Sequence, residues 1–358
     1  MDRVNESVTS GIIPEAKSAY DLELFGINDG SFVLLHSLAI TCLGLSILSA
    51  LCVIVASTMD RGLKGIFSWT KSERFVFYLA CTETILGITH LLDHSQILIT
   101  RDHVRPAVLC QAYGFVLYTF VFAELFTVNI IAVTIFFIIY LRKKVEYGSR
   151  DWKVFLWIFG LPFTSAVVLA SMGQFGTNTT LTSIHVCAGD RECWCSCLHV
   201  KAQNSDKNVV RITCIPVKRI CASTVVNHAI VLYCLFDAVR GTTSNSVVAI
   251  PIIVILITNT ILYGLTWHRI RSETRDIEVS LGPRVEATSR SHRAARNMLL
   301  FLVVYFIQWW PASVLSILVL FPNPPSILTY LVATFSNIGG ILNGVVYFFI
   351  RRRSYTSS

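Results

Sequence analysis

Long apolar segments recur along the chain, separated by shorter stretches that carry most of its charge. A helix of about 20 apolar residues is long enough to cross the hydrocarbon core of a bilayer. The pattern therefore predicts an all-α membrane protein, a bundle of seven transmembrane helices. The predicted spans are 31–58, 74–99, 107–141, 153–173, 247–268, 296–321 and 326–350.

The composition is typical of a membrane protein. Hydrophobic residues make up 53% of the chain and charged residues only 15%, and the mean hydropathy is +0.60. Helices as apolar as these need lipid as their solvent. The net charge of +8 does not indicate a nucleic-acid partner, because the basic residues gather in particular loops, as membrane-orientation signals do.

Those basic residues occupy alternate loops and the C-terminal end, so the positive-inside rule places these parts in the cytoplasm. An odd number of spans then puts the N-terminus outside and the C-terminus in the cytoplasm. The chain divides into an extracellular tail (1–30), a membrane domain (31–350) and a short cytoplasmic tail (351–358). Two Asn-x-Ser/Thr sequences lie on the predicted outer side, so Asn5 and Asn178 are predicted glycosylation sites.

The predicted extracellular loop 174–246 is long and irregular. Its segment 220–236 is almost uncharged and nearly long enough to span. Three interpretations stay open: a packed or interfacial segment, an eighth span, or an insert at about 200–240. We favour the first, because an eighth span would move the arginine-rich stretch 269–296 to the outside, against the charge rule.

Two further segments carry local signals. Residues 272–295 are rich in Ser, Arg and Glu and contain a Gly-Pro pair, which predicts a flexible cytoplasmic linker. Cys193, Cys195 and Cys197 form a Cys-x-Cys-x-Cys run around Trp194, which raises the question of a metal site. No nearby histidine cluster completes such a site, and none is predicted.

Short motifs in three of the spans resemble those of rhodopsin-like G-protein-coupled receptors. Tyr305, Trp309 and Pro311 match the aromatic, tryptophan and proline positions of that family's sixth helix. Asn343 and Tyr347 match its Asn-Pro-x-x-Tyr motif, with Gly344 in place of the proline, a change that predicts a weaker kink. The second span carries Leu-Ala-Cys-Thr-Glu at 79–83, similar to the family's Leu-Ala-x-x-Asp. The resemblance covers about residues 31–350.

The third span departs from that family. Residues 134–136 are Thr-Ile-Phe, where the family has Asp-Arg-Tyr. The start of this span, Cys-Gln-Ala-Tyr-Gly-Phe at 110–115, and the pair Trp194-Cys195 are more similar to the slime-mould cyclic-AMP receptors and their animal relatives. The resemblance implies a disulfide from Cys110 to the long loop. Cys195 is the predicted partner, with Cys193 and Cys197 as rivals.

Two acids fall near the middle of the bilayer. At ~1.5 Å per residue, Glu83 lies about 14 Å from the inner edge and Glu124 about 21 Å from the outer one. An ionised acid there costs about 3 kcal/mol, so each is expected to face the bundle, be paired or be protonated. In rhodopsin-like receptors these places border a sodium pocket. Our hypothesis is a shared sodium or proton site, together with Asn343, that biases the inactive state. The alternative is a protonated Glu83 that is hydrogen-bonded locally.

The resemblance implies a plasma-membrane receptor, not an enzyme, that passes the signal of an unidentified extracellular ligand to a heterotrimeric G protein. Its activation switch would be formed by Tyr305, Trp309, Pro311, Asn343 and Tyr347, and its basic loops would meet the G protein or anionic lipid. Apart from a sodium ion, no cofactor is predicted.

Two other functional classes stay open. In a transporter or channel the two membrane acids would carry ions. In an intramembrane metal hydrolase, Glu83, His90 and His94, which share a helix face, would bind zinc. The last two spans contain no histidine to complete such a zinc site, so we expect these side chains to form a polar rim over a ligand cavity.

Overall fold

A computed structural model describes residues 20, 24, 26–27, 30–61, 63–143, 145–177, 180–181, 229–230, 234–237, 244–279, 284–318 and 326–355. These residues include all of the predicted spans except positions 319–321. The predicted glycosylation sites Asn5 and Asn178 lie outside the described residues, as do Cys193, Cys195 and Cys197.

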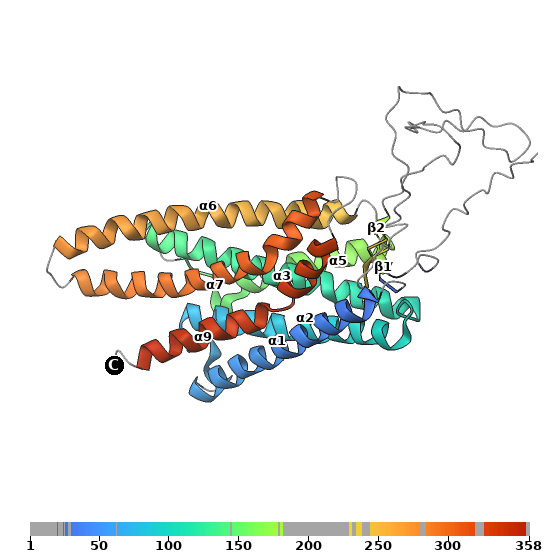
Figure 1. Cartoon of the computed structure of the whole chain (residues 1–358). Coiled ribbons are helices and arrows are strands. Elements are labelled where there is room, and N and C mark those ends of the chain that lie inside the picture. The colour runs from blue at the N-terminus through green and yellow to red at the C-terminus, as the bar shows by residue number, and fades with distance from the viewer. Residues whose placement is uncertain are drawn as a thin grey trace, which may run out of the picture.

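The chain forms a bundle of long helices (Figure 1). Six helical segments are long and apolar enough to cross a membrane, and a seventh is formed by two helices that meet at an angle of 45°. The predicted seven-helix membrane fold is therefore confirmed. The segments are α1 (Ser31–Arg61), α2 (Lys71–Thr100), α3 (Ala107–Ile139), α4 to α5, α6 (Ser244–Val279), α7 (Arg284–Leu318) and the bent pair α8 (Ser326–Phe335) and α9 (Gly339–Tyr355).

Local sequence signals explain several boundaries. Helix α2 follows the short helical turn η2 (Leu63–Ser68) and begins with a capping box, in which Thr70 and Glu73 exchange side-chain to backbone hydrogen bonds. The fourth span starts after a turn, η3 (Ser149–Asp151). It is made of α4 (Trp152–Phe155), a wider π-helical turn η4 (Leu156–Gly160) and α5 (Leu161–Ser171). Pro162, at the start of α5, has no N–H to donate, which accounts for the widened turn before it.

The predicted flexible linker at 272–295 is wrong. Helix α6 continues to Val279 and α7 begins at Arg284, so both helices run well beyond the predicted spans. The linker residues include many Arg, Glu and Ala, which are good helix formers in water. Only residues 280–283 separate the two helices.

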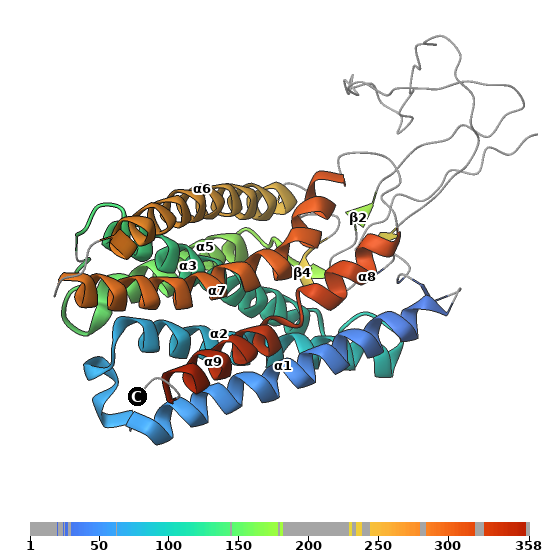
Figure 2. The same ribbon diagram turned by 60° about the vertical axis from the view of Figure 1, so that its left-hand side comes forward.

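The two ends of the bundle differ in character. At one end, here called the basic end, α1, α6 and α9 finish and α7 begins (Figures 1 and 2). The opposite end, here called the disulfide end, contains the start of α1, the ends of α2 and α5, and the strands. Helix α3 runs through the middle and is the most buried span, with 72% of its apolar window inside the structure.

A short antiparallel pair of strands packs on α3 at the disulfide end. Strands β1 (Phe175–Thr177) and β4 (Cys234–Phe236) pair with Phe175 opposite Phe236, and a second pair joins β2 (Thr180–Leu181) to β3 (Ala229–Ile230). The Phe175 and Phe236 rings stack at 5.6 Å, and both rest against Tyr118 of α3. The described residues of 220–236 therefore form strands, which favours a packed segment over an eighth span.

Candidate functional site

The two membrane acids meet at the centre of the bundle. Glu83 of α2 and Glu124 of α3 are 6% and 1% exposed. Glu83 accepts a hydrogen bond from Asn343 Nδ2 of α9 at 3.1 Å, and Glu124 accepts one from Trp309 Nε1 of α7 at 3.4 Å. The two carboxyl groups lie close enough for the charge of one to act on the other. Four helices therefore converge on one pair of acids.

Gln308 connects this pair to the break between α8 and α9. Its Nε2 donates to the carbonyl of Ser336 at 3.2 Å, within the non-helical residues 336–338. Asn337 bonds back to the carbonyl of Ala333 at 2.7 Å. In a membrane such contacts are needed, because a broken helix exposes backbone groups that lipid cannot satisfy. The seventh span therefore bends at this break between α8 and α9, and not at Gly344, the position where the family has a proline.

Three oxygen atoms around the acids keep unused bonding capacity. Within the described residues, Glu124 Oε2, Gln308 Oε1 and Asn343 Oδ1 are buried without a hydrogen-bond partner. A small cavity, with about 10 Å³ of room for the centre of a water molecule, lies between α1, α2, α7 and α9 and is lined by Glu83 and Asn343. Buried polar atoms rarely stay unpaired in native proteins, so these oxygens keep the capacity to accept a further hydrogen bond.

Glycines let α9 approach α1 closely. A Cβ atom at Gly344 would lie 2.1 Å from Ser49 Oγ, and one at Gly340 would lie 2.5 Å from the carbonyl oxygen of Ser46. The backbone N–H of Gly340 donates to Ser46 Oγ at 2.8 Å. Glycine at 344 therefore has its own packing reason, which the comparison with a proline motif did not suggest.

The remaining switch candidates lie on α7 and α9. Tyr305 is 1% exposed, and its hydroxyl has no hydrogen-bond partner among the described residues. Pro311 lies inside α7, in the C-terminal part of this helix, which is its disulfide-end half. Tyr347 of α9 accepts a hydrogen bond from Ser57 Oγ of α1 at 3.2 Å, so it ties these two helices together near the basic end. The predicted roles of these residues in activation stay predictions.

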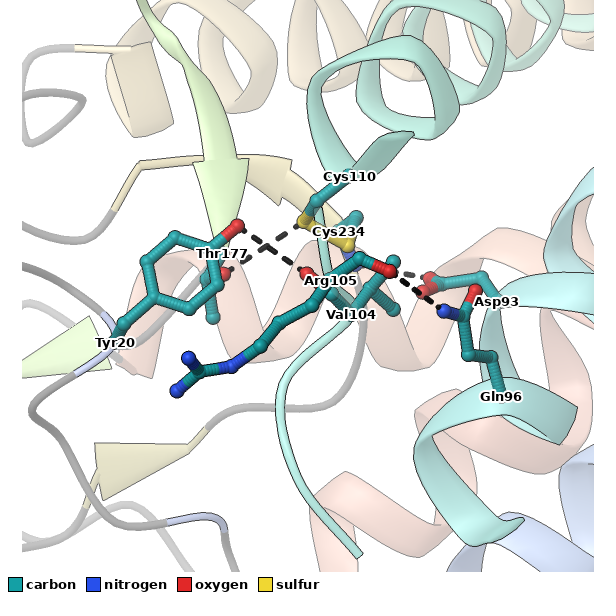
Figure 3. Close-up of a disulfide and its surroundings, with 8 residues drawn as sticks. All are labelled: Tyr20, Asp93, Gln96, Val104, Arg105, Cys110, Thr177 and Cys234. Carbon is teal, nitrogen blue, oxygen red and sulfur yellow. Dashed lines mark hydrogen bonds between the residues drawn. A yellow bond between two sulfur atoms is a disulfide. The ribbon is translucent and has the colours of Figure 1, made fainter. Parts of the chain in front are cut away.

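The disulfide differs from the prediction. Cys110 at the start of α3 is bonded to Cys234 of β4, so the predicted partner Cys195 is wrong, and the same bond excludes its rivals (Figure 3). The pairing of β4 with β1 holds Cys234 against the buried end of α3, where Cys110 also contacts Thr177 of β1. The sequence offered one weak signal for this bond, because the apolar segment 220–236 contains two cysteines, Cys221 and Cys234.

Asp93 of α2 fixes the same strand from a second side. Its Oδ2 accepts the backbone N–H of Cys234 at 2.9 Å, and its side chain is fully buried (Figure 3). Gln96 and Tyr20 bond the carbonyls of Arg105 and Val104, in the connection that leads to α3. The disulfide end of α2 is therefore linked to both the strand and the loop before α3.

The basic end is closed by a second polar network that the sequence did not reveal. Arg74 of α2 binds Asp151 with Nε–Oδ2 and Nη2–Oδ1 distances of 2.5 Å and 3.1 Å, and both side chains are buried. Tyr147 bonds Thr134 of α3, the place where the rhodopsin-like triplet is missing. Burial raises the pKa of the Tyr147 phenol, so this hydroxyl stays protonated at ordinary pH and keeps its hydrogen bond with Thr134.

The predicted rim histidines face a partner that was not predicted. His90 and His94 of α2 lie with His36 of α1 in one cluster near the disulfide end. In the described part of the chain, no group of three His, Cys, Asp or Glu side chains is arranged to hold a metal ion. The histidine arrangement therefore gives the hydrolase alternative no support.

Comparison with solved structures identifies the fold. The structure is similar to the crystal structure of squid rhodopsin, with a TM-score of 0.59, 14% sequence identity, and coverage of 89% of this chain and 81% of the rhodopsin chain. No protein-family model matches the sequence, and no curated protein matches it either. At 14% identity the similarity establishes a rhodopsin-like seven-helix fold and leaves function to be argued from the site.

Proposed function

We propose that the protein is a plasma-membrane receptor that passes the signal of an extracellular ligand to a heterotrimeric G protein. The observation that carries this proposal is the convergence of Trp309 and Asn343 on Glu124 and Glu83, in a rhodopsin-like bundle. Gln308, next to Trp309, bonds the break between α8 and α9. Helices α2, α3, α7 and α9 share one polar centre, so a shift of α7 at the disulfide end must change contacts that α9 makes toward the basic end.

The disulfide supports the predicted orientation. A bond between Cys110 and Cys234 is typical of an oxidising compartment, and it lies at the end opposite the basic loops. The charge pattern and the disulfide therefore favour the same arrangement, with the disulfide end outside and the basic end in the cytoplasm. The predicted glycosylation of Asn5 and Asn178 belongs to this orientation.

The polar centre fits a sodium ion or a shared proton. Two carboxylates in contact repel each other strongly, so the pair is stable when a proton or a cation lies with it. Sodium is a hard cation that prefers oxygen ligands. Glu83, Glu124, Gln308 and Asn343 supply such oxygens, three of them without a protein partner among the described residues. These four residues would hold the ion, and its loss would free α7 and α9 to move.

In this mechanism the ligand acts on the disulfide-end half of α7. Trp309 bonds Glu124 and lies two residues before Pro311, a residue type that weakens a helix, so a change of α7 at this position would pull Trp309 away from the acid. Gln308 would then release the Ser336 carbonyl, and α7 would separate from α3 at the basic end. The long basic-end extensions of α6 and α7 offer the G protein a large contact surface.

The test is a panel of G-protein activation assays in cells that express the full chain at the surface. In the proposed mechanism the bond from Trp309 to Glu124 restrains α7, so Trp309→Ala removes that restraint and is expected to raise basal activation. A typical hydrogen bond of about 1 kcal/mol corresponds to a change of about fivefold. Trp310→Ala is the matched control, because this neighbouring tryptophan is 42% exposed on the outside of the bundle.

Two results would count against the proposal. One is equal basal activation by Trp309→Ala and Trp310→Ala. The other is complete absence of G-protein activation by the wild-type chain and both variants, although all three reach the surface. Ion or substrate flux in vesicles without G protein would favour the transporter alternative instead.

A further inference from the structure

Three histidines from two helices form one buried cluster at the disulfide end. The Nδ1 atoms of His36 (α1) and His94 (α2) are 2.8 Å apart, and these side chains are 1% and 2% exposed. The ring of His90, one turn before His94, lies 4.6 Å from the His94 ring. The cluster is about 8 Å along α1 from its first residue, Ser31.

The contact between His36 and His94 is a hydrogen bond only for certain protonation states. A neutral imidazole has one N–H and one nitrogen lone pair, so one Nδ1 must carry hydrogen and the other must not. When both rings are protonated, both Nδ1 atoms carry hydrogen. The bond is then lost, and two positive charges face each other across the α1–α2 contact.

The described residues beside His36 and His94 include one aromatic ring and one acid. The ring of Phe32, on α1, covers His36 at 4.5 Å. The acid next to His94 in sequence, Asp93, is engaged by the backbone N–H of Cys234 in β4 and lies near Tyr113 of α3.

The other ionisable or polar groups face His90. Asn337, from the break between α8 and α9, is hydrogen-bonded to His90, and the next acid along α2 is Glu83, seven residues earlier. Helix α1 contributes no charged residue between Ser31 and Thr58 besides a protonated His36. Two protons added at the His36–His94 contact would therefore place like charges on both sides of the α1–α2 interface.

A metal ion does not fit between these nitrogens. Two imidazole nitrogens that bind zinc at about 2.1 Å in tetrahedral geometry are about 3.4 Å apart, which is more than the 2.8 Å seen here. An Asn or Gln pair could hold two helices together at every pH. Histidine is the side chain whose charge normally changes between about pH 5 and pH 8.

We propose that His36, His90 and His94 form a binding site for protons through which acid at the disulfide end loosens α1 from α2. This inference goes beyond the proposed receptor function, because it concerns a second site, separate from the Glu83–Glu124 pair. It also holds for the purified chain in the absence of any G protein.

The experiment measures the position of α1 as a function of pH. Ketone-bearing residues are introduced genetically at Leu34 and Met172, which are 62% and 63% exposed, and carry spin labels without using the cysteines. Pulsed electron resonance then gives the distance between the labels in the full chain in lipid nanodiscs, from about pH 8 to about pH 4. A second pair, Ile99 with Met172, reports on α2.

The wild-type Leu34–Met172 distance is expected to lengthen on acidification by about 2 Å, the size of common helix shifts, while the Ile99–Met172 distance stays constant. His36→Asn and His94→Asn each keep a polar atom near the Nδ1 position but cannot take a proton, so each should abolish the shift. His103→Asn is the matched control, a histidine of the same end outside the cluster, and it should retain the shift.

A wild-type distance that does not change with pH would overturn the proposal, as would a shift that persists in both cluster variants. Melting temperatures at pH 8 report whether each variant folds. A single folded variant is sufficient, since either substitution removes the state with one charge on each side of the His36–His94 contact. If neither folds at pH 8, the pair is a structural requirement and the proton site is rejected.

Discussion

Individual residues of the polar centre show why acids can lie in the middle of this bundle. Glu83 and Glu124 each have a side-chain donor from a different helix, and each is almost fully enclosed. An isolated charge in the hydrocarbon would be costly. Donors from α7 and α9 lower that cost by hydrogen-bonding the two acids of α2 and α3. The unpaired oxygens nearby could accept a proton or bind a sodium ion.

Glu83→Gln tests this site directly. The variant keeps the shape of the side chain but removes the charge that would hold sodium. Sodium should raise the melting temperature of the wild-type chain, since a ligand that binds only the folded state stabilises it. Glu83→Gln should lose that rise. The control is Glu73→Gln, which removes the charge of an acid outside the polar centre, at the exposed capping box of α2. This variant should keep the sodium effect. Equal sodium effects in both variants would reject the ion site.

Gly344 gives a second prediction at this scale. In Gly344→Ala the new Cβ would meet Ser49 Oγ at 2.1 Å, so the α1–α9 contact must shift. Overpacking of this kind costs about 1–3 kcal/mol of stability. Removing the hydroxyl in the double variant Ser49→Ala/Gly344→Ala leaves the nearest side-chain atom at 3.4 Å, an ordinary contact, and should restore the melting temperature.

Gly264 on α6 is the control for that prediction. No atom lies within 4 Å of the Cβ position there, so Gly264→Ala meets no obstacle. Alanine is a better helix former than glycine by about 1 kcal/mol, and this variant should be as stable as wild type or more so. A Gly344→Ala protein that melts like Gly264→Ala would contradict the close α1–α9 approach.

At the scale of elements, the basic end is held by a loop that packs on α2. Arg74 also donates to the carbonyls of Phe67 and Trp69, so one guanidinium joins the turn before α2 to the start of the fourth span. Lys71 bonds the carbonyl of Val145 in the same loop. These bonds attach the loop to α2. The loop also places Tyr147 against α3, in the region where the family triplet is absent.

Asp151→Asn should destabilise the chain strongly. The substitution leaves the buried Arg74 without its counter-charge, and breaking a buried pair in this way costs about 3–5 kcal/mol. Asp102→Asn breaks the ion pair between Asp102 and Arg105. The Arg105 side chain is 66% exposed and the Asp102 side chain is 49% exposed. An exposed pair contributes about 0–1 kcal/mol. Thermal unfolding in detergent should therefore separate the two variants clearly, and equal melting temperatures would contradict the role assigned to Arg74.

Sequence was a good guide to the helices and a partial guide to the site. Seven apolar spans specify seven helices, because a membrane admits few alternatives to a helix. The same logic brought Glu83 and Glu124 into the interior. The partners of polar groups were harder to predict, because Gln308, Ser336 and His36 acquire meaning only when helices distant in sequence come together. The predicted partner of Cys110 was wrong for the same reason, since the pairing of β4 with β1 decides which cysteine lies next to α3.

At the scale of the whole molecule, one covalent bond joins the long loop to the bundle within the described part of the chain. Cys110 and Cys234 are 124 residues apart in sequence, so the bond closes a large loop. In the chain-entropy model a disulfide that closes a loop of about 100 residues stabilises the folded protein by about 4.7 kcal/mol. Asp93 and the stacked phenylalanines keep the strand in position only as long as it stays near α3, and the disulfide limits how far it can move.

Cys234→Ser should therefore lower both the melting temperature and surface expression, and Cys110→Ser should do the same to an equal extent. The double variant should be no worse than either single one, because each substitution already removes the whole bond. Cys52→Ser is the control, an exposed free cysteine on α1. Peptide mapping of the unreduced wild-type chain should recover Cys110 linked to Cys234. A linkage of Cys110 to Cys195, with a normal melting temperature for Cys234→Ser, would show that the strand is held by packing alone.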